Sequence, residues 1–135
     1  MVTHSLLQPQ EIEVFYILPT VRRELAVQMK LKGFKQTKIA ELLHVENASI
    51  SQYLNEKRGN KVELGEDVKK EIAVSAGKIT SALTFIAEMQ HLLRFIRSSG
   101  TLCQIHKQLS QVPEECNPCL VNCFGDNDGH ARICY

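Results

Sequence analysis

The stretch QTKIAELLHVENASISQYL, residues 36–54, decides the fold of this chain. Its first half places apolar side chains at helical spacing, and its second half does so again after a turn near Val45. The first apolar set is Ile39, Ala40, Leu42 and Leu43, and the second is Ile50, Tyr53 and Leu54. Two short helices whose apolar faces pack on one another are predicted, with small Ala40 at the crossing. This pattern is typical of a helix-turn-helix.

The second helix of this pair has small and amide side chains on the face that points away from the first. We assign Asn47, Ala48, Ser51 and Gln52 to this outer surface and count the neighbouring Ser49 among the candidate DNA contacts. Asn and Gln can form paired hydrogen bonds with adenine, Ser can bond to several bases, and the Ala methyl can contact thymine. The face therefore suits base edges in the major groove of double-stranded DNA.

Positive charge is concentrated around the same stretch. Between Arg22 and Lys61 there are nine Lys or Arg residues against four Glu residues, a net charge of +5, whereas the whole chain carries only +1. Candidate phosphate contacts are Lys35 and Lys38 before the first helix or in it, and Lys57 and Arg58 after the second. A plain helical hairpin with a solvated lysine surface is the alternative, but spacing, face chemistry and charge together favour DNA binding.

Composition excludes several other classes. No apolar run approaches the roughly 20 residues needed to cross a membrane. The beginning of the chain lacks the basic-then-apolar layout of a signal peptide, because Glu11 and Glu13 interrupt it. We expect no membrane partner and a cytoplasmic location. Trp is absent and aromatic residues make up 6%, which argues against an aromatic platform for single-stranded nucleic acid.

The rest of the chain predicts an all-α fold. We expect helices over 19–31, 66–76 and 79–97, with Pro19 in the first turn of its helix, where its missing N–H is tolerated. Residues 10–17 could form a strand or a helical turn, and we favour the helical turn. Gly33, Gly77 and Gly100 mark helix ends. The predicted organisation is a DNA-binding domain over 1–77, a long helix over 78–100, and a small irregular metal-binding tail over 101–135.

The long helix has a wide apolar face. Its apolar residues are Ala82, Phe85, Ile86, Met89, Leu92, Leu93 and Ile96. Burial in the chain's own core is one interpretation. Because helix-turn-helix proteins commonly pair on two-fold DNA sites, we favour a contact between two copies, which predicts a homodimer.

All five cysteines lie in the last 33 residues. In a reducing compartment, clustered cysteines bind metal more often than they form disulfides. The predicted ligands are Cys103, Cys116, Cys119 and Cys123, with Cys134 and His106 as alternates.

Two metal centres fit this pattern. Four thiolates suit an iron–sulfur cluster, and [4Fe-4S] is the type that we expect. A structural zinc ion could instead take Cys103, His106, Cys116 and Cys119. The fifth cysteine favours the cluster, because a structural zinc site is closed by four ligands and would leave this cysteine without a role. Either centre could order a tail that is short of apolar residues.

The segments YILPTVRRELA, GFKQTKIAELLHVENASISQYLNEKRG, GTLCQIH and ECNPCL resemble the Xre-type, lambda-repressor-like family of predicted transcriptional regulators. The resemblance covers roughly residues 11–120. It implies a dimeric repressor-type fold, a recognition helix near 47–55, Gln36 close to a phosphate, and Cys103, Cys116 and Cys119 in the tail motif. His44 stands where the family usually has a turn glycine, and Cys123 and Cys134 lie beyond the matched part.

The expected function is therefore a DNA-binding transcription regulator whose iron–sulfur cluster senses redox or cluster status. The alternative is a DNA-binding regulator with a structural zinc and no sensing by the tail. A cysteine-dependent redox or sulfur-transfer enzyme is a remote third interpretation, because the sequence shows no paired nucleophile and base and no phosphate loop. We do not expect an enzyme.

Overall fold

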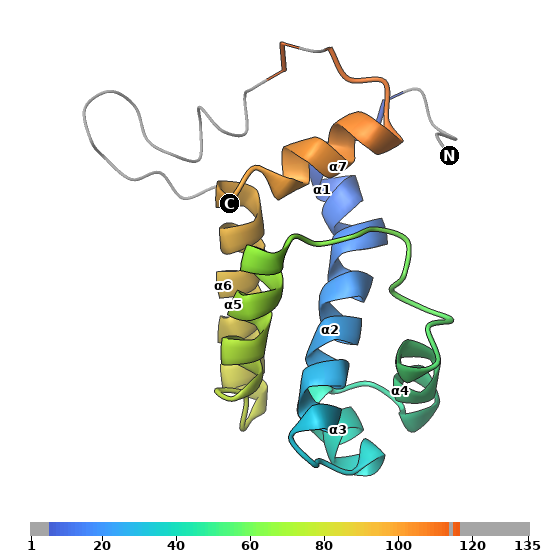
Figure 1. Ribbon diagram of the computed structural model, residues 1–135, viewed down its shortest axis with the longest axis vertical. Coiled ribbons are helices and arrows are strands. Elements are labelled where there is room, and N and C mark those ends of the chain that lie inside the picture. The colour runs from blue at the N-terminus through green and yellow to red at the C-terminus, as the bar shows by residue number, and fades with distance from the viewer. Residues whose placement is uncertain (1–5, 114, 117–135) are drawn as a thin grey trace, which may run out of the picture.

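Helix α2 (Leu18–Leu31) is the central element of the fold. The computed structural model describes residues 6–113 and 115–116, and over these residues it contains helices and no strand. Helices α3 and α4 lie at one end of α2, α7 crosses near the other end, and α5 and α6 stand side by side along it (Figure 1). The predicted all-α class is confirmed. No described helix is long and apolar enough to span a membrane.

The chain enters α2 through one continuous helical run. It begins as α1 (Pro9–Ile12), widens into a π-helical turn, η1 (Glu13–Ile17), and continues as α2. The helical turn favoured over 10–17 and the helix predicted over 19–31 are thus confirmed but are joined. The wide turn directly precedes Pro19, which cannot donate a backbone hydrogen bond and would crowd the carbonyl four residues earlier in a regular α-helix.

The helix pair predicted from residues 36–54 is present. Helix α3 spans Gln36–Leu43 and α4 spans Asn47–Leu54. Ile39, Leu43 and Ile50 are fully or almost fully buried, as the apolar spacing predicted. Both helices contact α2 as well as each other, and α3 also contacts α6.

Helices α5 and α6 complete the body. Helix α5 spans Glu66–Ala76, as predicted. Helix α6 spans Ala82–Ser98 and begins three residues later than expected. Ser81 caps it: its hydroxyl accepts from the Thr84 amide at 3.2 Å, and the Thr84 hydroxyl accepts from the Ser81 amide at 2.8 Å. This capping box fixes the start of α6, while Ile79 is buried in the core before the helix begins.

The apolar face of α6 is divided between the core and the surface. Met89, Leu92, Leu93 and Ile96 are buried in the same core cluster as α2 and α5. Phe85 is half-buried, whereas Ile86 and Ala82 are exposed. Most of the surface that suggested a second copy is therefore covered within the chain itself.

The expectation of an irregular tail from Thr101 onward is wrong for its first nine residues. They form helix α7 (Thr101–Leu109), on which Leu102 and Ile105 are buried. The apolar positions are few but lie on one side of the helix, which is sufficient when α1 and α6 provide a surface to cover them.

Helix α7 also holds the N-terminal segment in place. The Leu7 amide donates to the Ser110 hydroxyl at 2.6 Å, and His106 Nε2 donates to the Leu7 carbonyl. Both polar backbone groups of Leu7 are therefore satisfied by α7, although Leu7 itself is buried.

A buried ion pair joins η1 to α6. Arg97 on α6 donates to Glu13 of η1 at 2.7 Å, and their side chains are 5% and 7% exposed. Each residue lies on an otherwise apolar helix face, beside Ile96 and Ile12 respectively. An opposite charge on each of two apolar stripes is the sequence signal that could have predicted this contact.

Candidate nucleic-acid interface

The turn between α3 and α4 fixes the angle of the helix pair. His44 adopts the left-handed conformation, with φ 55° and ψ 43°. The Val45 amide donates to the Ala40 carbonyl at 3.1 Å, and the His44 amide donates to the Glu41 carbonyl at 3.3 Å. These two bonds make a Schellman motif, which normally has glycine at the left-handed position. His44 therefore occupies the glycine conformation that its place in the sequence implied.

Gln36 ties the beginnings of the two helices together. Its Nε2 donates to the Ser51 hydroxyl at 2.6 Å and to the Asn47 carbonyl at 3.2 Å. Ser51 is half-buried as a result, so its hydroxyl is engaged inside the pair. The resemblance implied that Gln36 lies near a phosphate. In the structure its amide nitrogen donates to two residues of α4.

The outer face of α4 carries the remaining predicted residues. Asn47, Ala48 and Gln52 are exposed, and neighbours at spacings of four residues share one side of the helix. Ser49 is half-buried and accepts from Arg58 at 3.2 Å. The structure thus leaves two amides and one methyl group open to a ligand, and engages both serines within the protein.

Cations lie at both ends of this face. Lys35, Lys38 and Lys57 are exposed, and Lys38 approaches Glu41 at 3.8 Å. Arg58 is exposed as well, with its guanidinium carbon 5.6 Å from the centre of the Tyr53 ring. This contact and the bond to Ser49 hold Arg58 against α4, which reduces the side-chain entropy that binding would cost.

The segment after α4 is pinned to α2. Gly59 has φ +73°, and a Cβ at this position would lie 2.5 Å from the Pro19 carbonyl oxygen. Only glycine permits this close approach. Nearby, Arg23 on α2 forms ion pairs with Glu24 at 2.7 Å and with Glu56 at 2.8 Å. The Arg23–Glu56 pair could not be predicted from the sequence, because no local pattern pairs residues 33 positions apart.

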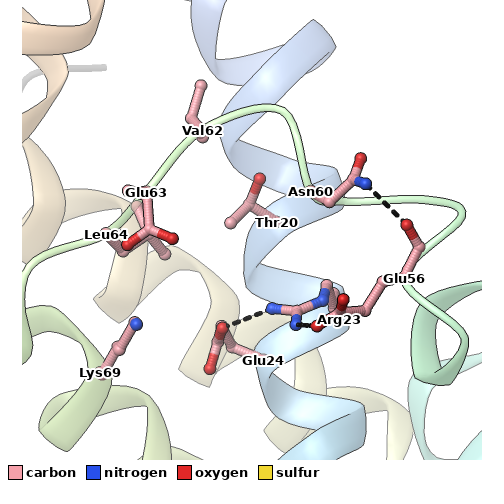
Figure 2. Close-up of a pocket in the computed structure, with 9 residues that line it drawn as sticks. All are labelled: Thr20, Arg23, Glu24, Glu56, Asn60, Val62, Glu63, Leu64 and Lys69. Atoms are coloured by element: carbon pink, nitrogen blue, oxygen red, sulfur yellow. Dashed lines mark hydrogen bonds and ion pairs between the residues drawn. The ribbon is translucent and has the colours of Figure 1, made fainter.

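A cavity of about 360 Å³ lies between α2, this segment and α5. Figure 2 shows Arg23 and Glu24 on α2, Asn60 on the connecting segment, and Glu63 and Lys69 facing them from the α5 side. The lining is mostly polar and includes Thr20, while Val62 and Leu64 contribute the apolar part. None of the residues that line this cavity was among the candidate site residues predicted from the sequence.

The predicted metal ligands are only partly within the described residues. Cys103 lies on α7 and Cys116 lies after it; both are half-buried, and no disulfide joins these two. Cys119, Cys123 and Cys134 lie outside the described residues. Over 6–113 and 115–116, no group of three or more His, Cys, Asp or Glu residues could hold a metal ion. The alternate ligand His106 is buried and uses Nε2 to hold Leu7.

Comparison with family models, curated proteins and solved structures finds no match. The interpretation of this chain therefore rests on its own residues and their geometry.

Proposed function

We propose that this protein is a transcription regulator that binds double-stranded DNA through a helix-turn-helix formed by α3 and α4. The observation that carries the proposal is the outer face of α4, where Asn47, Ala48 and Gln52 are exposed on a helix whose inner face is buried by Ile50 and Tyr53. A short helix of this kind, fixed from one side, can enter the major groove without unfolding any contact.

The charges beside this face support the same proposal. Lys35 and Lys57 have no ion-pair partner within the described part of the chain, and both are exposed. They flank the amide-bearing face, at the start of α3 and just past the end of α4. Lysines in these positions neutralise phosphates and release counterions, which supplies most of the sequence-independent affinity.

Selection from a random duplex library, followed by salt titration of the selected duplex, tests the proposal. We expect a preferred sequence to emerge and affinity to fall steeply with salt. Lys57→Ala should weaken binding to all duplexes alike and reduce the salt slope by about 1. Lys70→Ala is the matched control, because Lys70 is an exposed lysine on α5, away from the helix pair. Failure to enrich any sequence, with equal slopes for both variants, would refute DNA reading by α4.

We also propose a homodimer, but it rests on fewer exposed apolar side chains of α6 than the sequence indicated. Two large apolar side chains on the outer side of α6 stay exposed, Leu83 at 75% and Ile86 at 60%. They are three residues apart and so lie on one helix face. Pairing this face about a two-fold axis would present two copies of α4 to a two-fold DNA site.

Sedimentation equilibrium tests the pairing. The double change Leu83→Ser and Ile86→Ser should shift the protein to monomer. Leu31→Ser is the matched control, because Leu31 is equally exposed at 75% but lies at the end of α2. A monomeric wild type, or equal effects of the two variants, would contradict pairing through α6.

The cysteine tail is proposed to bind an iron–sulfur cluster that modulates DNA binding, with structural zinc as the alternative. Support comes from the donor chemistry of Cys103, Cys116 and the cysteines that follow, and from the position of Cys103 on α7, which packs directly against α6. A change in the tail could therefore reach the proposed dimer helix.

Anaerobic purification with an absorption spectrum and analysis for iron, sulfide and zinc separates the two metals. A cluster predicts broad visible absorbance with matching iron and sulfide, and DNA affinity that changes when the cluster is lost. Zinc without iron or sulfide would favour the structural zinc site over the cluster. The absence of both metals would contradict a metal-binding tail.

A further inference from the structure

The cavity between α2, the segment after α4 and α5 contains polar groups that the fold itself leaves unsatisfied. Arg23 Nε is completely buried and has no acceptor among the described residues, although the other nitrogens of this guanidinium hold Glu24 and Glu56. A buried N–H without a partner is costly, so it is rare in native structures unless a ligand or water satisfies it. Arg23 itself lines the cavity, although its Nε has no accessible surface and does not open into it.

A second cation and a second anion line the same cavity without a partner. Lys69 is half-buried on α5, and within the described residues it has no ion-pair partner. Glu63 precedes α5 and likewise has no ion-pair partner in the described part of the chain. Figure 2 shows both side chains on the side of the cavity opposite Arg23. The cavity thus offers donors for a carboxylate and acceptors for an ammonium group.

The balance of charge indicates the kind of ligand. Three carboxylates, of Glu24, Glu56 and Glu63, face two cations, Arg23 and Lys69, so the lining carries a net charge of −1. A volume of about 360 Å³ lies within the range of small-molecule sites. A ligand with one carboxylate and two cationic groups would satisfy the open donors and acceptors and neutralise the site.

We propose that this cavity is an effector site for a free basic α-amino acid of the lysine or arginine class. The ligand carboxylate accepts from Lys69. Its α-ammonium and its side-chain cation donate to Glu63 and Glu24, and the short apolar part contributed by Val62 and Leu64 lies along its methylene chain.

The site is placed to influence α4. Glu56 lines the cavity two residues after α4 ends at Leu54, and its ion pair with Arg23 is one of the contacts that fix this segment to α2. A ligand that binds Glu24, which shares Arg23 with Glu56, would alter this connection and change the affinity of α4 for DNA. This regulatory step rests on the proposed DNA-binding function, whereas the binding step does not.

Isothermal titration calorimetry on the full chain without DNA tests the binding step. L-lysine and L-arginine should bind, and L-glutamate should not. Two analogues separate the halves of the ligand: cadaverine lacks the carboxylate and L-norleucine lacks the side-chain cation, so each should bind at least about tenfold more weakly, the loss expected for one charged hydrogen-bonding group. Cadaverine binding as tightly as lysine would overturn the carboxylate assignment and with it the proposal.

Two variants locate the site. Lys69→Met and Glu63→Gln should each lower lysine affinity by about tenfold or more, with circular dichroism unchanged. The matched control is Lys70→Met, since Lys70 is the neighbouring exposed lysine on α5 and does not line the cavity. Equal affinity of the Lys69 and Lys70 variants, or no heat with any basic amino acid at millimolar concentration, would overturn the site.

Titrating the duplex selected above in the presence and absence of lysine then tests the coupling. A change in DNA affinity supports the regulatory step. Lysine binding with unchanged DNA affinity would overturn regulation while the effector site stands, and binding in a protein that selects no duplex would separate this site from the DNA-binding proposal.

Discussion

From the sequence, helices α4 and α6 were each predicted to have a face that contacts a partner, and the two faces differ in how exposed they are in the structure. On α4 the proposed DNA-facing residues Asn47, Ala48 and Gln52 are exposed. On α6 most of the apolar residues assigned to a second copy are buried within the chain, and Ile86 is the large apolar side chain of this set that stays exposed. Leu83, which was not assigned to that face, is exposed three residues before it. The predicted exposed face is therefore largely present on α4, whereas on α6 it is mostly buried within the chain.

The difference lies in what polar and apolar side chains require. Amide side chains without an internal partner must face water, because burying them would cost hydrogen bonds. An apolar stripe must be covered, but its spacing does not state whether the same chain or another chain covers it. A polar face thus predicts its own exposure, whereas an apolar face predicts only burial.

The largest expected change in stability is at the buried ion pair near the C-terminal end of α6. Arg97→Met would leave Glu13 charged and buried without this partner, which should cost about 3–5 kcal/mol of unfolding free energy. The double variant Glu13→Leu with Arg97→Met should recover much of this loss, because neither charge remains. Urea denaturation measures both. Arg94→Met, an exposed position on the same helix, is the control, and an equally large loss there would contradict the special role of the buried pair.

The next test compares the two sides of α6 directly. Leu92 is completely buried, so Leu92→Ala should destabilise the fold by about 2–5 kcal/mol through lost burial and the cavity left behind. Gln90→Ala on the exposed side should change stability by no more than about 0.5 kcal/mol. Thermal or urea unfolding distinguishes the two, and a small loss for Leu92→Ala would mean that α6 is not part of the monomer core.

The sequence predicted the fold well wherever a local rule was sufficient. The bounds of α3, α4 and α5 follow from apolar spacing and turn residues, and the left-handed turn at His44 followed from its place in the motif. Helix α7 was missed because its short apolar stripe gains stability only from α1 and α6. The cavity and the Arg23–Glu56 contact were missed because they depend on pairing distant segments, which no local pattern encodes.

A third test asks whether the exposed Gln52 on α4 contributes to the recognition of DNA. Gln52→Ala removes an exposed amide, so stability should change by no more than about 0.5 kcal/mol. If the amide forms paired bonds with a base, discrimination at one position of the selected duplex should fall by about 1–3 kcal/mol. Competition binding with single-base variants of that duplex measures this, with Gln90→Ala as the control. Unchanged discrimination at every position would remove Gln52 from the interface.

The smallest test addresses the contact through which α6 reaches the helix pair. The His44 ring stacks on Phe85 with centroids 6.0 Å apart and an interplanar angle of 24°, a contact that we expect to contribute about 0.5–1.5 kcal/mol. His44→Gly would lose this stack but relieve the left-handed strain of about 1 kcal/mol, so its net effect in the wild type should be close to zero. In a Phe85→Ala background no stack remains to be lost, and the same change should stabilise the fold by about 1 kcal/mol. Urea denaturation of the four proteins in this cycle gives the coupling energy. A coupling of zero would mean that α6 supports the turn between α3 and α4 without help from the ring contact, and a proposed signal from the tail would have to reach α4 by another route.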